Sequence, residues 1–486
     1  MKFFQQLLCI GFILSSVVGC KVGKRYVRPN VVNIESYYGR NALLDSAIID
    51  RSNLADVNWR NYFVDSTLIS LIDSALVYNI DMLKEAKRVE IGEQAFRQSR
   101  ANFFPSLGLS PFDFNREYYS ENYNNFGSNR ARRNHGENPP QSLYTERLAY
   151  SAGLFSSWEI DLWGKLRWQK EAARAAFIQS QDFQKAVQTA IVAEVASTYY
   201  NMLLTKSQIA VAERNLDLGR NTLKIVKLQF EADETTSLAI QQTESQTLRA
   251  EALIPQLERS YTILENRLNQ LLGRYPRPIA IEENLEDVVF DDRFVTGVPF
   301  ELINNRPDVA AAEQALISSN ALVGVASAMR YPSLTLGAGA GLNTMDASSF
   351  FDPIGSGFAL LNGAFFQPIF QNRRLKTNYK IAVAERELAL LDFKDNVILA
   401  VREVSDALVT VEKFREQYDI ARRRIIVTTK GVQDASLLFQ SDFANYLEVI
   451  NAQEDALQSE LELADLKRQI ILANIELYRS LGGGWK

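Results

Sequence analysis

The chain has 486 residues, of which 47% are hydrophobic and 23% charged, and its formal net charge is −5. Such a length exceeds one ordinary core, the composition is that of a folded protein, and the slightly acidic balance gives no sign of a nucleic-acid partner. One histidine, His135, and two cysteines near the start argue against a zinc site built from several His or Cys ligands.

The amino terminus has the pattern of a secretory signal. A basic start precedes an apolar run from Phe3 to Val18, which is short for a membrane span and suits the core of a signal peptide. The run ends in Val18-Gly19-Cys20, which resembles a lipobox. We expect residues 1–19 to be removed and the Cys20 thiol to carry a diacylglyceryl group. An ordinary signal peptide with an incidental cysteine is the alternative.

Residues 20–65 form a loop-like stretch in which we expect the lipid anchor and an N-terminal segment. Its basic residues would contact anionic headgroups or simply be solvated: Lys21, Lys24, Arg25 and Arg28. Helical patterning follows from about Ser66 to Phe103, with one apolar face formed by Leu68, Leu71, Ile72, Ala75 and Leu76.

Two hairpins of extended chain are predicted, at about 104–162 and 331–370. In the first, Pro105 opens an extended stretch, residues 111–142 have the polar composition of an exposed loop, and Tyr144 to Leu162 alternate with period two. In the second, alternation begins at Pro332, a loop covers 343–357, and a further strand covers Phe358 to Phe370. The glycines at 337, 339 and 341 lie within an alternating strand, so they do not indicate a dinucleotide loop.

Each hairpin is followed by a very long helix and a return helix. The long helices are expected at about 164–231 and 371–440, each roughly 100 Å if unbroken, and the return helices at about 235–272 and 443–481. Pro255 should kink or delay the first return helix. Gly273 and Gly482–Gly484 should end the two return helices as C-caps.

These two halves carry the same pattern. Phe230 aligns with Phe439 (439 − 230 = 209) and Asp233 with Asp442 (442 − 233 = 209), within matching helical stretches at 228–271 and 437–480. An internal repeat of this kind favours an assembly with rotational symmetry. Four strands cannot close a barrel, whereas three chains would supply twelve and leave no edge.

Several segments in this order resemble the TolC-type outer-membrane factors, specifically the lipoprotein branch of tripartite efflux systems. They are Val18–Cys20, the run from Trp158 to Arg167, Asn305–Val309, Tyr331–Leu334, Gln367–Phe370 and Leu481–Trp485. The resemblance covers essentially the whole mature chain. We interpret the Asn305–Val309 segment as a helix start, with Pro307 in the first turn.

The resemblance implies a mixed α and β membrane protein. Its trimeric 12-stranded outer-membrane β-barrel, four strands per chain, would continue into a periplasmic α-helical barrel with a small equatorial mixed region. The chain would then divide into repeat 1 at 66–276, an equatorial linker at 277–298, repeat 2 at 299–481 and a tail at 482–486.

The resemblance also implies site residues. A periplasmic gate would involve Glu448, Asn451 and Phe439, with Glu448 keeping the family's acidic charge and Asn451 lacking it. A solvated helix-face glutamate is the alternative for Glu448. Asp233 and Asp442 would form the tips of the helix turns, near which an adaptor protein docks, and they replace the glycines that the family usually has there.

The implied function is a passive exit duct of a tripartite pump, carrying drugs, dyes or detergents from periplasm to exterior. The implied partners are a periplasmic adaptor, an RND-type inner-membrane pump and outer-membrane lipid. Apart from the lipid on Cys20 no cofactor is expected, and no catalytic constellation is present, so no enzymatic activity is expected. The alternatives are a duct for protein export or metal-ion efflux and, third, a non-conducting coiled-coil surface lipoprotein.

Overall fold

The computed structural model describes residues 22–29, 57–120, 144–285, 288, 305–441 and 443–486. The predicted signal peptide at 1–19, Cys20 and Asp442 lie outside these residues. The described residues gather into two compact units. The first holds the described parts of Met1–Val27, Glu93–Ala175 and Ile317–Leu388, and the second those of Arg28–Gly92, Ala176–Leu316 and Ala389–Lys486.

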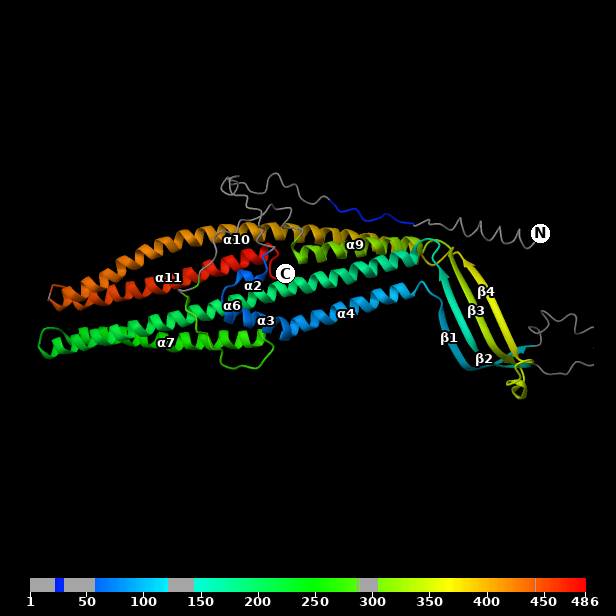
Figure 1. Ribbon diagram of the computed structural model, residues 1–486, viewed down its shortest axis with the longest axis horizontal. Coiled ribbons are helices and arrows are strands. Elements are labelled where there is room, and N and C mark those ends of the chain that lie inside the picture. The colour runs from blue at the N-terminus through cyan, green and yellow to red at the C-terminus, as the bar shows by residue number, and fades with distance from the viewer. Residues whose placement is uncertain (1–21, 30–56, 121–143, 286–287, 289–304, 442) are drawn as a thin grey trace, which may run out of the picture. The chain divides into compact units, whose positions relative to one another are not determined.

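Long helices and one sheet make up the described structure (Figure 1). The first half contains α2 (Trp59–Tyr62), α3 (Ser66–Tyr78), α4 (Ile80–Ala101), β1 (Ser106–Ser120), β2 (Tyr144–Ile160), α6 (Lys165–Glu231) and α7 (Ser237–Leu271). The second half contains α9 (Pro307–Ala328), β3 (Ser333–Thr344), a 3-10 turn η4 (Ala347–Ser349), β4 (Gly357–Phe366), α10 (Arg374–Gln440) and α11 (Tyr446–Ser480). The fold is therefore mixed α and β, as predicted.

Corresponding long helices of the two halves have equal lengths. Helices α6 and α10 have 67 residues each, and α7 and α11 have 35 each. The starts of α7 and α11 lie 209 residues apart (446 − 237 = 209), as do the starts of α6 and α10 (374 − 165 = 209). The predicted bounds of these four helices are correct to within three residues, because long uninterrupted periodicity is the strongest signal that a sequence carries.

Both return helices end as predicted. Gly273 and Gly482 adopt positive φ angles of 64° and 87°. The next residue donates its backbone N–H back to the last turn, Arg274 to Asn269 O at 3.1 Å and Gly483 to Tyr478 O at 3.0 Å. This is the Schellman arrangement, which satisfies carbonyls that a helix end otherwise leaves free.

Two helix predictions need correction. Helix α7 begins at Ser237 and runs through Pro255, so the proline does not delay it. The expected single helix from Ser66 to Phe103 is two helices bent by 44°. Asn79 separates them: its amide nitrogen donates to Leu271 O at 2.8 Å, and its amide oxygen accepts from Asp81 N at 2.9 Å. Asn79 therefore caps the start of α4. The sequence does not reveal this cap, because the residues on either side of Asn79 continue the helical pattern.

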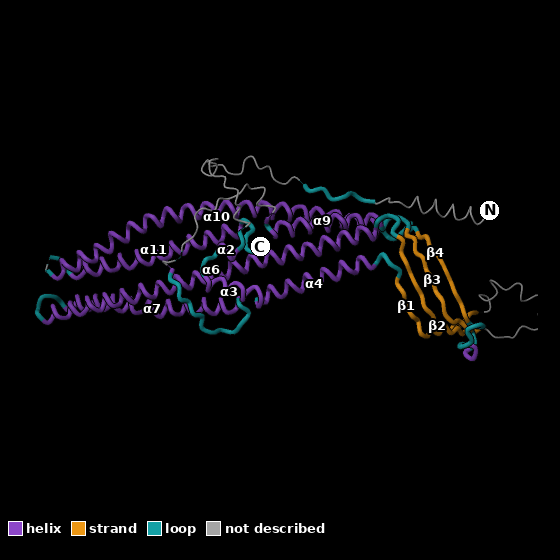
Figure 2. Tube along the Cα trace, viewed as in Figure 1, coloured by secondary structure: helices purple, strands orange, loops and turns teal. Residues whose placement is uncertain are grey.

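The four strands form one antiparallel sheet in the order β1-β2-β3-β4 (Figure 2). The register places Leu109, Leu154, Ala340 and Ala359 side by side across it. The expectation of a loop from residue 111 is wrong for 111–120, because β1 continues to Ser120 after a register shift between Ser110 and Asp113. A bulge at Pro111 accommodates the missing N–H. Strand β4 ends at Phe366, short of the predicted Phe370, and Pro368 follows.

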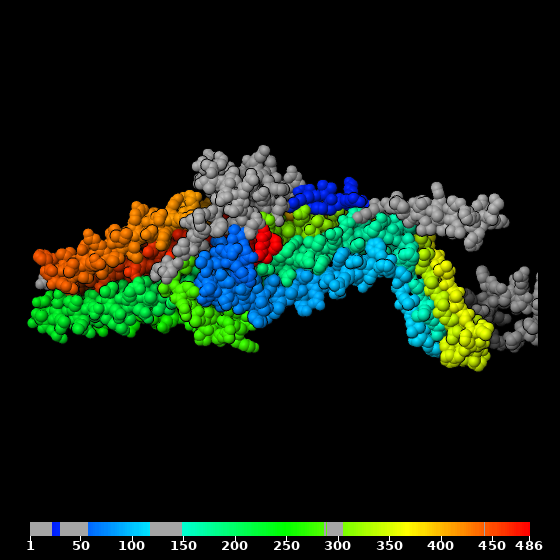
Figure 3. Space-filling view, viewed as in Figure 1, coloured from blue at the N-terminus to red at the C-terminus, as the bar shows by residue number. Residues whose placement is uncertain are grey.

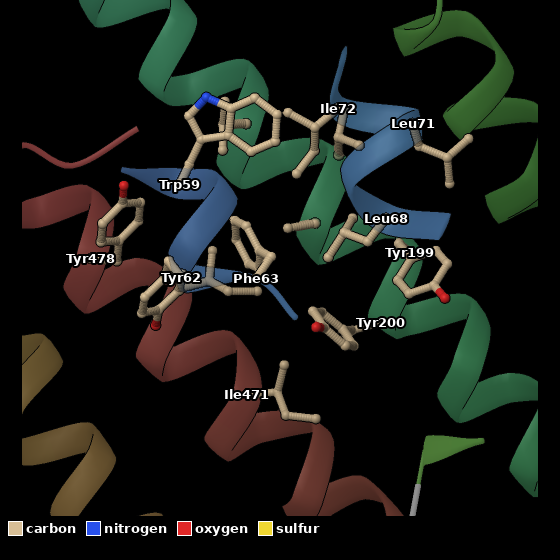
Figure 4. Packing of buried hydrophobic residues seen from close by; sticks show 14 of the residues in the cluster. Trp59, Tyr62, Phe63, Leu68, Leu71, Ile72, Tyr199, Tyr200, Ile471 and Tyr478 are labelled. Carbon is tan, nitrogen blue, oxygen red and sulfur yellow. The ribbon is translucent and has the colours of Figure 1, made fainter. Parts of the chain in front are cut away.

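The main core lies in the second unit, where the short helices α2 and α3 pack between α6 and α11 (Figure 4). Trp59, Phe63, Leu68 and Ile72 are at most 2% exposed. Tyr62 stacks on Tyr478 with ring centroids 4.3 Å apart. The predicted apolar face of α3 is confirmed, since Leu68, Leu71, Ile72 and Ala75 are all buried.

Candidate functional site

The turns that join each long helix to its return helix lie together around a small apolar cluster. Each of the four helices contributes one buried residue to this cluster: Val226 of α6, Ala239 of α7, Phe439 of α10 and Val449 of α11. The cluster ties the α6–α7 turn to the α10–α11 turn.

Asp233 adopts the left-handed backbone that a glycine would adopt more readily. Its φ is 60°. Its N–H donates to Phe230 O at 3.1 Å, and the N–H of Glu234 donates to Gln229 O at 2.8 Å. Asp233 therefore occupies the position after the C-cap of α6 in a Schellman turn. At the second turn Phe443 N donates to Leu438 O at 2.9 Å in the same way, although Asp442 itself is outside the described residues.

The three predicted gate residues have different surroundings. Phe439 is 6% exposed within the apolar cluster, so it packs the two turns together. Glu448 and Asn451 are exposed on α11, three residues apart and so on one side of the helix. Glu448 is also the third residue of α11, and its N–H donates to the side chain of the N-cap Asn445 at 3.2 Å. That helix-start position fits an N-terminal glutamate on its own, and a role for the three residues in gating stays a prediction.

Polar bonds between the helix pairs were not anticipated from the sequence. Gln453 Nε2 donates to Thr222 Oγ1 at 3.0 Å in a buried position, and Tyr446 Oη donates to Gln242 Oε1 at 2.6 Å. Isolated polar residues on a helix face give no sequence signal for such a partner.

Arg306 joins the start of α9 and the end of α11 to the middle of α10. It is 4% exposed, and its guanidinium donates to Asp308 Oδ2 at 2.7 Å, to Glu403 Oε2 at 2.8 Å and to Ser480 O at 3.0 Å. Burial by itself would raise the pKa of the Asp308 carboxyl, but the hydrogen bonds and charge of Arg306 hold that pKa below its ordinary value. Helix α9 begins at Pro307, as predicted for this segment.

Two carboxyl groups share one tyrosine hydroxyl near the start of α3. Tyr199 Oη contacts the Asp65 carboxyl and lies 3.0 Å from Glu283 Oε2, and Thr67 Oγ1 donates to Glu283 Oε1 at 3.0 Å. Burial raises the pKa of Asp65. Burial opposes ionisation of Glu283 too, but the hydrogen bonds that it accepts lower its pKa. The arrangement joins the segment at 277–285 to α3 and α6.

The junction between β2 and α6 explains the run from Trp158 to Arg167. The Asp161 carboxylate accepts from Leu166 N at 3.0 Å and Arg167 N at 3.1 Å, which caps α6. Trp163 Nε1 donates to Pro332 O at 2.7 Å, which links this junction to the start of β3. The residues of this motif therefore turn a strand into a helix. Within the described ranges no group of three or more His, Cys, Asp or Glu residues could hold a metal ion.

The chain is similar along its length to several known proteins. It is 27% identical over 477 residues to the cation efflux system protein CusC of Escherichia coli K12, covering 98% of each chain. It is also 27% identical over 486 residues to the probable outer membrane lipoprotein SilC of Salmonella typhimurium, covering 99% of each. A crystal structure of CusC superposes with a TM-score of 0.80 at 25% identity, covering 96% of this chain and 100% of that one.

A family model is matched as well, over residues 71–274 and 298–483, and its description is "Outer membrane efflux protein". These two ranges take in the long helices, the sheet and both return helices described above. The chain belongs to the outer membrane efflux protein family.

Proposed function

We propose that three copies of this chain form the exit duct of a tripartite efflux pump, which passively conducts drugs, dyes, detergents and similar small molecules from the periplasm to the exterior. The observation that carries the proposal is a four-stranded sheet with two unpaired edges, in a member of an outer-membrane family. The inner-membrane pump supplies the energy, and this chain supplies a sealed path.

The sheet is unsuited to stand alone in water or in lipid. Its outer strands β1 and β4 pair on one side only within the described residues. Large apolar side chains on these strands are well exposed, including Leu107 at 73%, Leu109 at 67% and Leu361 at 84%. Unpaired backbone groups cost several kcal/mol each in lipid, so a spanning sheet must close on itself. Twelve strands from three chains meet that condition.

The helices suit a wall below such a barrel. Helices α6 and α10 have 67 residues each, which corresponds to roughly 100 Å. Their return helices and the equal offsets between the two halves support an internal repeat, so that each chain contributes two similar wall segments. A periplasmic adaptor would dock near the turns at Asp233 and Asp442, and Glu448 and Asn451 would lie at the gate.

Susceptibility measurements test the duct. Deletion should sensitise cells to dyes, detergents or antibiotics without changing the levels of secreted proteins, and expression of the wild-type chain should restore resistance. A change in secreted proteins with unaltered drug susceptibility would favour protein export. The detergent-extracted particle should have the mass of three chains, and a monomeric particle without a central pore would contradict the proposal.

Metal-ion export is a second candidate, favoured by the similarity of the chain to CusC, which is a cation efflux system protein. A passive duct needs no metal-binding cluster, so the lack of one among the described residues does not decide between the cargoes. Growth of the deletion strain on metal salts, compared with growth on dyes and detergents, separates the two.

A further inference from the structure

The segment just after Cys20 is bound to the first unit by its backbone. Val22 N donates to Trp163 O at 3.2 Å, and the indole Nε1 of Trp168 donates to Val22 O. Asn320 Nδ2 donates to Lys24 O at 3.2 Å. The side chains of Lys24 and Arg25 are exposed, so Val22 and Lys24 are held through backbone atoms, and further along the segment the Arg28 guanidinium pairs with Glu313 at 3.2 Å. In Figure 3 this segment is the dark-blue patch beside the yellow-green surface of α9.

Two glycines make this contact possible. Trp168 is 0% exposed and packs in a cluster with Ala172, Ala321 and Val325. A Cβ at Gly324 would overlap the Trp168 ring, so only glycine leaves room for the indole. Gly23 has φ 114°, and a Cβ there would lie 3.1 Å from Trp168 Cζ2. We call the site formed by Trp163, Trp168, Asn320 and Gly324 the N-terminal slot.

The slot is present in one half of the chain only. The position that corresponds to Trp168 in the second half is Thr377 (377 − 168 = 209), and the position that corresponds to Gly324 in the first half is Arg97 (324 − 97 = 227). The corresponding helices α10 and α4 therefore form without a tryptophan packed against a glycine. This asymmetry indicates that the slot serves the single N-terminal segment in addition to packing α6 against α9.

The slot lies where the sheet gives way to helices. Trp163 follows the last residue of β2 by three positions, and Trp168 is in the first turn of α6. Aromatic side chains are exposed at the same end of the sheet, with Trp158 at 39%, Tyr331 at 42% and Phe366 at 59%. Exposed aromatic residues at the end of a membrane strand favour the level of the lipid headgroups.

We propose that the N-terminal slot binds the peptide that follows the acylated cysteine and so fixes the lipid anchor at the helix end of the sheet. Cys20 precedes Val22 by two residues, about 7 Å of extended chain. The acyl chains would thus enter the leaflet at the headgroup level next to the sheet, instead of on a free tether. The anchoring role rests on the lipidation of Cys20 that the sequence predicts and on the proposed outer-membrane function, whereas peptide binding in the slot depends on neither.

Trypsin digestion of the full-length particle in detergent tests the proposal. Cleavage after Lys24 or Arg25 releases the N-terminal peptide, and a docked backbone resists it until the segment detaches. Gly23→Ala strains the left-handed backbone of the segment without touching the helices. Release of the peptide should be at least about tenfold faster in this variant than in the wild type. Gly324→Ala, which displaces Trp168, should have the same effect from the other side of the contact.

Val27→Ala is the matched control, because Val27 is 82% exposed and lies in the same segment. Its peptide should be released at the wild-type rate. Equal release rates for Gly23→Ala and the wild type, measured on particles of equal mass, would contradict binding of the N-terminal peptide in the slot. Palmitate labelling of the released peptide is read separately: an unlabelled but protected peptide would contradict lipidation and the anchoring role while leaving the duct intact.

Discussion

At the scale of single residues, backbone strain occurs at turns where a residue other than glycine has a positive φ angle. Asp233, Asn372 and Arg373 have positive φ angles of 60°, 47° and 63° within the described residues. Arg373 occupies the position that Gly164 holds in the first half (373 − 164 = 209), and Gly164 has φ 82°. An L-residue with a side chain is less stable in this region than glycine, so these positions carry strain that substitution can relieve.

Asp233→Gly should stabilise the protein. Removal of the side chain relieves the left-handed strain, and the greater freedom of glycine in the unfolded chain offsets part of the gain, leaving roughly 0.5 kcal/mol. The midpoint of thermal unfolding should rise by about 1–2 °C. Asp233→Ala is the control, because alanine keeps the strain and should lower the midpoint. A rise with alanine equal to that with glycine would contradict the explanation.

Arg306→Ala should be among the most damaging substitutions outside the apolar core. It removes the buried guanidinium that pairs with Asp308 and Glu403, although Glu403 keeps Arg479 at 3.4 Å. The cost should therefore be about 3 kcal/mol, the lower end of the range for breaking a buried pair. Arg402→Ala on α10 is the control, since the side chains of Arg402 and Asp406 are 66% and 73% exposed and their groups are 3.9 Å apart. Denaturation of both variants checks this, and similar stabilities would refute the role of Arg306.

At the scale of elements, one N-cap carboxyl and one tyrosine hydroxyl connect segments that are distant in the sequence. Asp65 is the N-cap of α3, accepting from Thr67 N at 2.8 Å and Leu68 N at 3.1 Å, and it also contacts Tyr199. Tyr199 brings Glu283 into the same group. Lys206 Nζ donates to the backbone oxygens of Ile281 and Glu283 at 2.9 and 3.2 Å. One α6 face thus holds the segment at 277–285.

The attachment of 277–285 should depend on pH with an optimum. The Asp65 pKa is raised from 3.8, so the folded state favours its protonated form, and that contribution to stability is lost as pH rises through the raised pKa. The Glu283 pKa is lowered from 4.5, so its contribution is lost as pH falls through the lowered pKa. Stability is therefore greatest between the two, where Asp65 is protonated and Glu283 is ionised.

Hydrogen exchange across 277–285, corrected for intrinsic rates, measures this dependence. Asp65→Asn keeps the cap, because asparagine is as good an N-cap as aspartate, and it removes the titrating group. Protection in this variant should no longer fall as pH rises. A decline that persists unchanged would assign the pH dependence to another group.

At the scale of the whole molecule, the described chain leaves its sheet edges open, and the proposed function depends on further copies that would close them. In the proposed trimer, three copies of Glu448 would converge near the axis. Carboxylates clustered at a pore attract cations into it. Glu448→Ala should therefore reduce cation preference or change single-channel conductance in planar bilayers, and Asn451→Asp should increase cation preference.

Asp419→Ala provides the matched control for the gate. Asp419 is also an exposed carboxylate, but it lies on α10, 21 residues before that helix ends at Gln440 (440 − 419 = 21), which is roughly 30 Å of helix away from the turns. Its loss should leave conductance and selectivity as in the wild type. If Glu448→Ala also behaves as the wild type does, the glutamate serves only the start of α11.

The sequence alone determined the elements whose signals are long and local. Periodicity that continues over tens of residues predicted the helices α6, α7, α10 and α11. Glycines predicted the ends of the return helices, and alternation together with prolines predicted the strands. Predictions from the sequence were wrong where a contact with a residue distant in the sequence outweighed the local pattern. Polar residues 111–120 belong to a strand because β2 pairs with them, and Asn79 divides a helix because Leu271 O is within reach of its amide.

Only the tertiary structure decided which distant side chains meet. The burial of Phe439 among Val226, Ala239 and Val449, the triple attachment of Arg306, and the Tyr199 hydroxyl between two carboxyls join residues up to 223 positions apart (449 − 226 = 223). Periodicity states which face of a helix is apolar but not which neighbour covers it. The same reason hid the N-terminal slot: a tryptophan and a glycine 156 residues apart (324 − 168 = 156) have no common signal until the folded chain brings them into contact.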